Sequence, residues 1–339
     1  MWMFIGASFA LDLAGVLPGF MIRYYGNAYY YLAAPAALLA AVGVMGWWAL
    51  RPWPDGARIR PVFLAWPRIS VEDRRRISNW HLVGRTLAYG ITLPLLWNTY
   101  ASWKTLIPVL QPFYLDPALA RVDRWIHLGR HPWEWLHSLL GSMAATEAID
   151  AVYFTWIFLI PIVILIFAFW RDSRRRAQFF LTYGLTLILL GSLAATALSS
   201  AGPCYYALLA NGPDPYAALM TSLRDIDARV GLHVTATQDW LWRSHLAQGQ
   251  VAYARISAMP SIHVGLTFLY VLATRGSGRI IEALGWTYFV LILIGSVYLG
   301  WHYAVDGYVA VLAVGALWKG ASWVLDRQQS SSPPLARDP

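Results

Sequence analysis

The sequence predicts an all-α integral membrane protein, a polytopic helix bundle with further helices lying along the bilayer surface. Its 339 residues are 58% hydrophobic and only 13% charged, whereas a soluble domain carries about 25% charged residues. The mean hydropathy is +0.46, and several apolar runs reach the ~20 residues that span a bilayer. The 19 Trp and 19 Tyr agree with this class, because both residue types favour the membrane–water interface.

Apolar segments follow one another along the chain and are the predicted helices. They comprise residues 2–22, 27–50, 84–107, 150–170, 178–200, 259–274, 281–300 and 303–325. Asp12 and Pro18 interrupt the first segment, so seven or eight spans are expected, with a packing or interfacial role for Asp12. Segment 259–274 is short for a span, as expected of a helix that begins inside a cavity.

The predicted organisation has three parts. Residues 1–83 form N-terminal transmembrane helices and a basic cytoplasmic loop, residues 84–325 a catalytic membrane core, and residues 326–339 a polar, disordered tail. Within the core, segment 108–149 mixes Trp, Leu and Ile with charged residues, which indicates an amphipathic helix in the interface plane. Segment 201–258 is long and polar, as expected of a lid.

The charge pattern predicts the orientation. The net charge of +8 comes from Arg residues in the short loops that begin at Arg51, Arg171 and Arg275. Positive loops face the cytoplasm, so this pattern indicates topology and argues against nucleic-acid binding. Segments 108–149 and 201–258 then lie on the opposite face, together with the beginnings of the helices near His263 and His302.

His302 and Asp306 form the first candidate site pair. Residues four apart lie on one face of a helix, and the Asp306 carboxylate can accept the Nδ1–H of the imidazole. This bond fixes the tautomer and leaves a lone pair on Nε2 of His302, which is the arrangement of an activated nucleophile.

His263 forms the second half of the predicted site. Pro260 suits the first turn of a helix and Ser261 offers a hydroxyl, while the free N–H groups of such a turn attract a phosphate-like anion. An imidazole there can donate a proton to a leaving oxygen and take one back. The pattern predicts phosphoryl transfer through a phosphohistidine on His302, oriented by Asp306, with His263 as acid and base. No metal and no cofactor are expected.

These residues carry a family resemblance. PSIH at 260–263 and GWHYAVD at 300–306 resemble the type 2 phosphatidic acid phosphatase superfamily, whose signatures are P-S-G-H and S-R-x5-H-x3-D. Ile262 replaces the glycine, and Ser296 stands at the arginine position. The K-x6-R-P motif is absent, since Lys104 and Lys319 are the only lysines and neither begins it.

With these departures the chain is similar to the inositol phosphorylceramide synthase-like branch. HYAVDG, GPCYY at 202–206 and the segment from Leu106 to Trp133 carry this likeness. The resemblance implies a six-helix core, a catalytic triad of His263, His302 and Asp306, and transfer of a phospho-headgroup between lipids, with phosphoinositol as a candidate. It also implies a site on the non-cytoplasmic face, periplasmic in a bacterial inner membrane or else lumenal.

Substrate contacts are expected from groups near the triad. The candidates are Ser261, Arg255, Lys104, Tyr205 and Tyr206. The predicted partners are a phospholipid donor, a lipid alcohol acceptor and bilayer lipids; the sequence indicates no oligomeric state. A phosphatase that uses water as acceptor is the alternative within this chemistry, and a non-catalytic transporter or scaffold is the alternative outside it.

Other polar residues of segment 108–149 have simpler interpretations. Asp116 and Asp123 could contact a headgroup, although a capping role or a solvated helix face is the commoner use of such residues. His127, His131 and His137 have irregular spacing for metal ligands and no cysteine nearby, so they are not expected to bind a metal.

Overall fold

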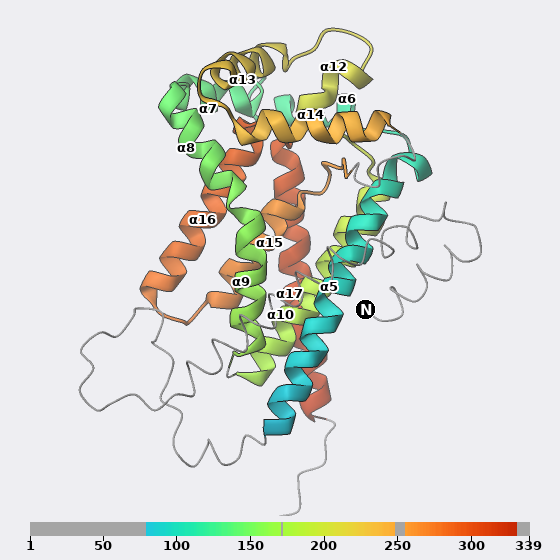
Figure 1. The fold of residues 1–339 in the computed structure, drawn as a ribbon, viewed down its shortest axis with the longest axis vertical. Coiled ribbons are helices and arrows are strands. Elements are labelled where there is room, and N and C mark those ends of the chain that lie inside the picture. The colour runs from blue at the N-terminus through green and yellow to red at the C-terminus, as the bar shows by residue number, and fades with distance from the viewer. Residues whose placement is uncertain (1–78, 171, 248–254, 331–339) are drawn as a thin grey trace, which may run out of the picture. The chain divides into compact units, whose positions relative to one another are not determined.

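The computed structural model describes residues 79–170, 172–247 and 255–330, and these residues form helices and turns with no strand (Figure 1). The predicted all-α class is confirmed. Predicted segments 2–22 and 27–50, Asp12 and most of the basic loop and of the tail lie outside the described residues. The chain divides into two units, and all described elements except the first part of α5 belong to the unit that includes residues 97–339.

Four stretches of the described chain are long and apolar enough to cross a membrane. The first is Met143–Ala168, formed by α8, Met143–Phe154, and α9, Trp156–Ala168. The second is Ser173–Ala197, formed by α10, Ser173–Leu185, the π-helix η2, Thr186–Ala194, and α11, Ala195–Ala197. The other two are α16, Arg279–Tyr298, and Ala304–Gln328 of α17, Ala304–Ser330. Apolar side chains such as Phe158, Leu284 and Leu312 are exposed on them, as expected where lipid replaces water. These helices identify an integral membrane protein.

Two further helices correspond to predicted apolar segments. Segment 84–107 lies in α5, Asn79–Leu110, which is not one of those four; polar residues such as Asn98 and Lys104 make it less apolar. α15, Ile262–Thr274, has 13 residues and is about 20 Å long at the α-helical rise. As the sequence predicts, α15 is too short to cross a bilayer of about 30 Å.

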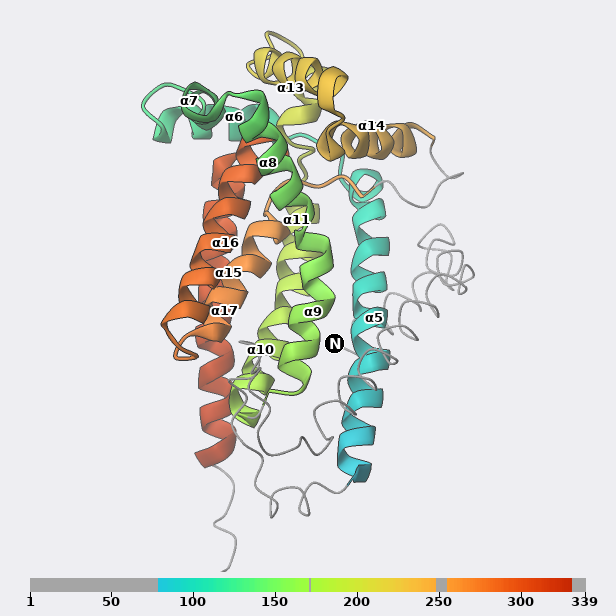
Figure 2. The same ribbon diagram turned by 60° about the vertical axis from the view of Figure 1, so that its left-hand side comes forward.

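Helices α6, Asp116–Ile126, α7, Pro132–Leu140, α13, Ala217–Val230, and α14, His233–Leu246, gather at the end of the bundle where α8 begins (Figures 1 and 2). Segment 108–149 thus contains two short helices instead of one, and its last residues belong to α8. Ser142 causes this early start, because its Oγ accepts from the Ala145 amide, 3.2 Å away. Predicted lid 201–258 also contains η3, Pro203–Tyr205, and α12, Tyr206–Leu209.

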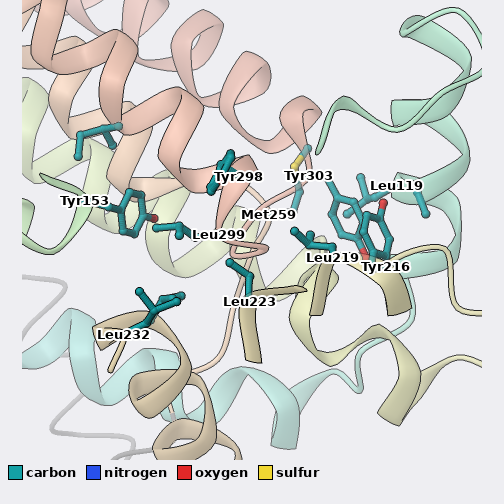
Figure 3. Packing of buried hydrophobic residues seen from close by; sticks show 13 residues of the cluster. Leu119, Tyr153, Tyr216, Leu219, Leu223, Leu232, Met259, Tyr298, Leu299 and Tyr303 are labelled. Atoms are coloured by element: carbon teal, nitrogen blue, oxygen red, sulfur yellow. The ribbon is translucent and has the colours of Figure 1, made fainter. Parts of the chain in front are cut away.

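A buried hydrophobic cluster joins these outer helices to the bundle. Figure 3 shows side chains of the outer helices, of α8 and of the connection between α16 and α17 packed together. The cluster includes Leu119, Tyr153, Leu219, Leu223, Tyr298 and Tyr303. Helix α15 packs mainly against α16 and α17. The outer helices and α15 therefore both lie close to the connection between α16 and α17.

Candidate active site

The connection between α16 and α17 places His302 through a tight turn. α16 ends at Tyr298, and the amides of Trp301 and His302 both donate to the Ser296 carbonyl, each at 3.0 Å. Gly300 has a φ of +73°, a left-handed conformation that glycine adopts without steric cost. His302 therefore leaves the turn just before α17, with only 4% of its surface exposed.

Asp306 contacts His302 through a capping turn. Its Oδ2 accepts from the Tyr303 amide at 3.1 Å and lies 3.3 Å from Nδ1 of His302. Because α17 begins at Ala304, His302 precedes the helix, and the prediction of one shared helix face is wrong in this detail. The four-residue spacing still brings the two groups together, because the carboxylate in the first turn bends back to the residues before it.

Ser261 starts α15 and links it to α17. The helix begins at Ile262, two residues after Pro260, so Pro260 does not belong to its first turn. Ser261 Oγ accepts from the Val264 amide at 3.4 Å, and the Ser261 amide donates to the backbone carbonyl of Asp306 at 3.2 Å. This pair of bonds orients the first turn of α15 toward the beginning of α17.

The first turn of α15 carries His263 to His302. Nδ1 of His263 lies 3.1 Å from Nε2 of His302. If the Nδ1–H of His302 is donated to Asp306, then Nε2 of His302 accepts the Nδ1–H of His263. Burial lowers the pKa of the His302 imidazole below its ordinary value, which favours the neutral, nucleophilic form.

A lysine lies beside the histidines, and an arginine lies near that lysine. Nζ of Lys104 donates to the Ser257 carbonyl at 3.4 Å, and its charge acts on the imidazoles of His263 and His302. Arg255 interacts electrostatically with Lys104. Of the predicted substrate-binding residues, Lys104 thus lies near the histidine pair, where positive charge suits a phosphate, and Arg255 interacts with Lys104.

The predicted tyrosines contact residues of segment 201–258. Tyr205 Oη donates to the Gln238 carbonyl at 3.0 Å, and the Tyr206 ring lies 5.6 Å from that of Tyr216. In the described chain both tyrosines contact the outer helices, and Ser261 uses its hydroxyl as a helix cap. GPCYY still supports the site, because the Cys204 amide donates to the Gly300 carbonyl at 2.9 Å.

Two aromatic side chains beside His263 are absent from the sequence prediction. The Trp156 ring meets the imidazole edge-on with 4.0 Å between centroids, and the Tyr153 ring lies 5.5 Å away. Both lie where α8 meets α9, inside an apolar run, and this pattern predicts only core packing or an interface role for them. The two rings therefore pack directly against the imidazole of His263.

The polar residues of α6 and α7 have structural partners. Asp116 and Asp123 accept backbone amides from other segments. This corresponds to the capping role, one of the alternatives that the sequence analysis gave beside a headgroup contact. His127 lies 3.0 Å from Tyr308 Oη, His131 3.3 Å from Tyr216 Oη, and His137 3.0 Å from the Tyr298 carbonyl.

Comparison with known proteins gives one match. The family model described as PAP2 superfamily matches residues 117–319, a range that contains His263, His302 and Asp306. No curated protein and no solved structure matches the chain.

Proposed function

The chain belongs to the PAP2 superfamily, and from this premise we propose that it is a lipid phosphotransferase that moves a phospho-headgroup from a phospholipid to a lipid alcohol. Membership supports a lipid enzyme of the phosphatase or phosphotransferase type. The observation that carries the proposal is the continuous chain His263–His302–Asp306, joined at 3.1 and 3.3 Å. An imidazole with an orienting carboxylate on one nitrogen and a proton carrier at the other is equipped for covalent catalysis.

In the first proposed step, Nε2 of His302 attacks the phosphorus of the donor. The N–P bond forms, the P–O bond to the diacylglycerol oxygen breaks, and the imidazolium form of His263 gives that oxygen a proton and becomes neutral. Asp306 holds the Nδ1–H of His302 and stabilises the positive charge that develops on the ring. The product is the headgroup phosphate carried on His302 and free diacylglycerol.

In the second step, the hydroxyl of the acceptor lipid attacks the same phosphorus. His263, which gave up a proton in the first step, takes the hydroxyl proton, the N–P bond breaks, and neutral His302 is restored. Lys104 and Arg255 are proposed to hold the non-bridging phosphate oxygens in both steps, because stabilising charge on these oxygens is a large part of phosphoryl-transfer catalysis.

Two observations favour a lipid alcohol over water as acceptor. His302 is 4% exposed and Asp306 is fully buried, and Tyr303, which follows His302, belongs to the buried cluster of Figure 3. A site closed to bulk water protects the phosphohistidine from hydrolysis. The departures from the phosphatase signatures at Ile262 and Ser296 point in the same direction.

The proposed activity is tested with purified protein in liposomes. Headgroup-labelled phospholipids, phosphatidylinositol among them, are offered with and without diacylglycerol or ceramide as acceptor. Label that moves to the acceptor lipid with wild-type protein, but not with His302→Ala, supports the transferase. Label that appears only in water identifies a phosphatase instead, and equal transfer by His302→Ala excludes His302 as the nucleophile.

We also propose that the site faces away from the cytoplasm. Cys204 is the only cysteine, so a Cys204→Ser protein accepts single labelling sites. Asn211→Cys, exposed before α13, should react with a membrane-impermeant maleimide in intact cells with a permeable outer membrane. Ser173→Cys, exposed at the start of α10, should react only after lysis. The reverse pattern would place the site on the cytoplasmic face.

A further inference from the structure

Two buried carboxylates of α6 hold the residues that immediately follow His302. Asp123 accepts from the amide of Ala304 through Oδ2 at 2.8 Å and from the amide of Val305 through Oδ1 at 2.9 Å. Asp116 accepts from Tyr303 Oη at 2.9 Å. Each carboxylate is only 2% exposed, so these bonds replace water instead of competing with it.

These bonds give α17 a cap from a distant helix. The first amides of an α-helix have no partner within the helix, and a residue just before the helix usually accepts them. Here Asp123 does so across 181 residues of sequence. The capped amides belong to residues between His302 and Asp306, so the cap restrains the backbone that joins the two groups.

Asp116 restrains the same connection from its other side. Besides Tyr303, its carboxylate accepts the amide of Gly202 at 2.8 Å and that of Ala201 at 3.0 Å. The GPCYY segment that begins at Gly202 in turn holds the Gly300 carbonyl through Cys204. One carboxylate therefore ties both flanks of His302 to the beginning of α6.

Helix α6 has one buried face and one exposed face. Asp116, Leu119, Ala120 and Asp123 are the buried residues of the helix, and their spacing of three and four residues puts them on one face. The Trp125 side chain, on the other face, is 79% exposed. α6 therefore presents a carboxylate face to the α16–α17 connection and an aromatic residue outward.

We propose that Asp123 and Asp116 are positioning residues for the His302–Asp306 pair, an inference that rests on the function proposed above. They touch neither histidine; they set the backbone from which Nε2 of His302 must point at phosphorus. A displacement of about 1 Å in a reacting group can cost 100-fold in rate, so loss of this restraint should lower kcat and leave KM nearly unchanged.

Asp150 provides a matched control. This carboxylate of α8 is 3% exposed and caps α14 from a different helix, accepting the amides of His233 at 2.8 Å and Val234 at 2.9 Å. Asp150→Asn removes the same chemical group from the same kind of cap, but on a helix that carries no proposed catalytic residue. Any general effect of losing a buried cap on folding appears in both variants.

The experiment compares Asp123→Asn, Asp116→Asn and Asp150→Asn in the full chain. Hydrogen exchange read by mass spectrometry should show faster exchange at Ala304 and Val305 in Asp123→Asn, and at His233 and Val234 in Asp150→Asn. This readout needs no substrate, so it tests the restraint even if the liposome assay finds no transfer.

Turnover is then measured with the phospholipid that the wild-type protein uses in liposomes. We expect kcat to fall about 100-fold in Asp123→Asn and by a similar factor in Asp116→Asn, with KM within about threefold in both and kcat within about threefold in Asp150→Asn. Wild-type kcat in Asp123→Asn despite faster exchange at Ala304 and Val305 would overturn the proposal. An equal loss of kcat in folded Asp150→Asn would also overturn it, since the effect would then be general.

Discussion

Nε2 of His302 lies 3.1 Å from Nδ1 of His263, although 39 residues separate the two histidines. The nitrogen that is proposed to attack phosphorus thus faces the ring that is proposed to donate the proton. A phosphorus atom attacked by Nε2 must occupy the direction in which His263 Nδ1 now lies. Substrate binding should therefore part the two rings, with the phosphate replacing their hydrogen bond.

His263→Gln should separate proton donation from nucleophilic attack. Loss of a general acid typically costs about 10²- to 10⁴-fold, and we expect a loss in this range for single-turnover release of diacylglycerol. A para-nitrophenyl phosphodiester of the same headgroup has a leaving group that needs no proton, so His263→Gln should form the phosphohistidine from it at nearly the wild-type rate. His302→Ala should fail with both substrates. Equal losses with the two substrates in His263→Gln would contradict the role of His263 as acid.

Lys104→Ala should impair transfer while leaving folding nearly intact. Removal of one donor to transition-state charge costs about 10²- to 10³-fold in kcat, and Lys104→Arg should recover part of this loss because it keeps the cation. Lys319, the other lysine of the chain, is exposed on α17 far along the sequence from the histidines, so Lys319→Ala is the matched control. Kinetics of the three variants beside their thermal unfolding check the proposal; equal turnover in both alanine variants would remove Lys104 from the site.

The pH dependence should reflect the buried nucleophile. A protonated imidazole has no lone pair for attack, and burial lowers the pKa of His302 from its ordinary 6.5. The rate of phosphohistidine formation should therefore stay constant as pH falls past 6.5 and decline only at lower pH. The para-nitrophenyl substrate is used, because proton donation by His263 then does not enter the rate. A decline centred above pH 6.5 would contradict the neutral, buried state.

The sequence was sufficient to predict the helical membrane class and the short helix that begins at the site. Both follow from local properties, namely the length of an apolar run and its interruptions. The pairing of His263 with His302 could also be anticipated, because charge counting placed the beginnings of both helices on one side of the membrane. The structure brings these two beginnings together.

Other features depend on contacts that no local pattern contains. Asp123 could be read as a capping residue, but the helix that it caps begins 181 residues later in the chain. Trp156 and Tyr153 stand in an apolar run where aromatic residues are common, and only the packing of α15 against the bundle brings His263 to them. The start of α15 moved from Pro260 to Ile262 because Ser261 supplies the cap.

Gly191→Ala should weaken both stability and transfer through the position of α5. A Cβ added at Gly191 would lie 2.5 Å from Cε2 of Tyr100, which stands one helical turn before Lys104, so the ring must shift and we expect α5 to shift with it. Overpacking of this kind costs about 1–3 kcal/mol, and the shift should also lower kcat by displacing the Lys104 ammonium. Gly320→Ala is the control, because nothing lies within 4 Å of its added Cβ and alanine favours a helix by about 1 kcal/mol. Thermal unfolding and turnover are the measurements. Combining Gly191→Ala with Tyr100→Leu should recover stability. Unchanged stability and kcat in Gly191→Ala alone would show that the approach of Tyr100 does not position Lys104.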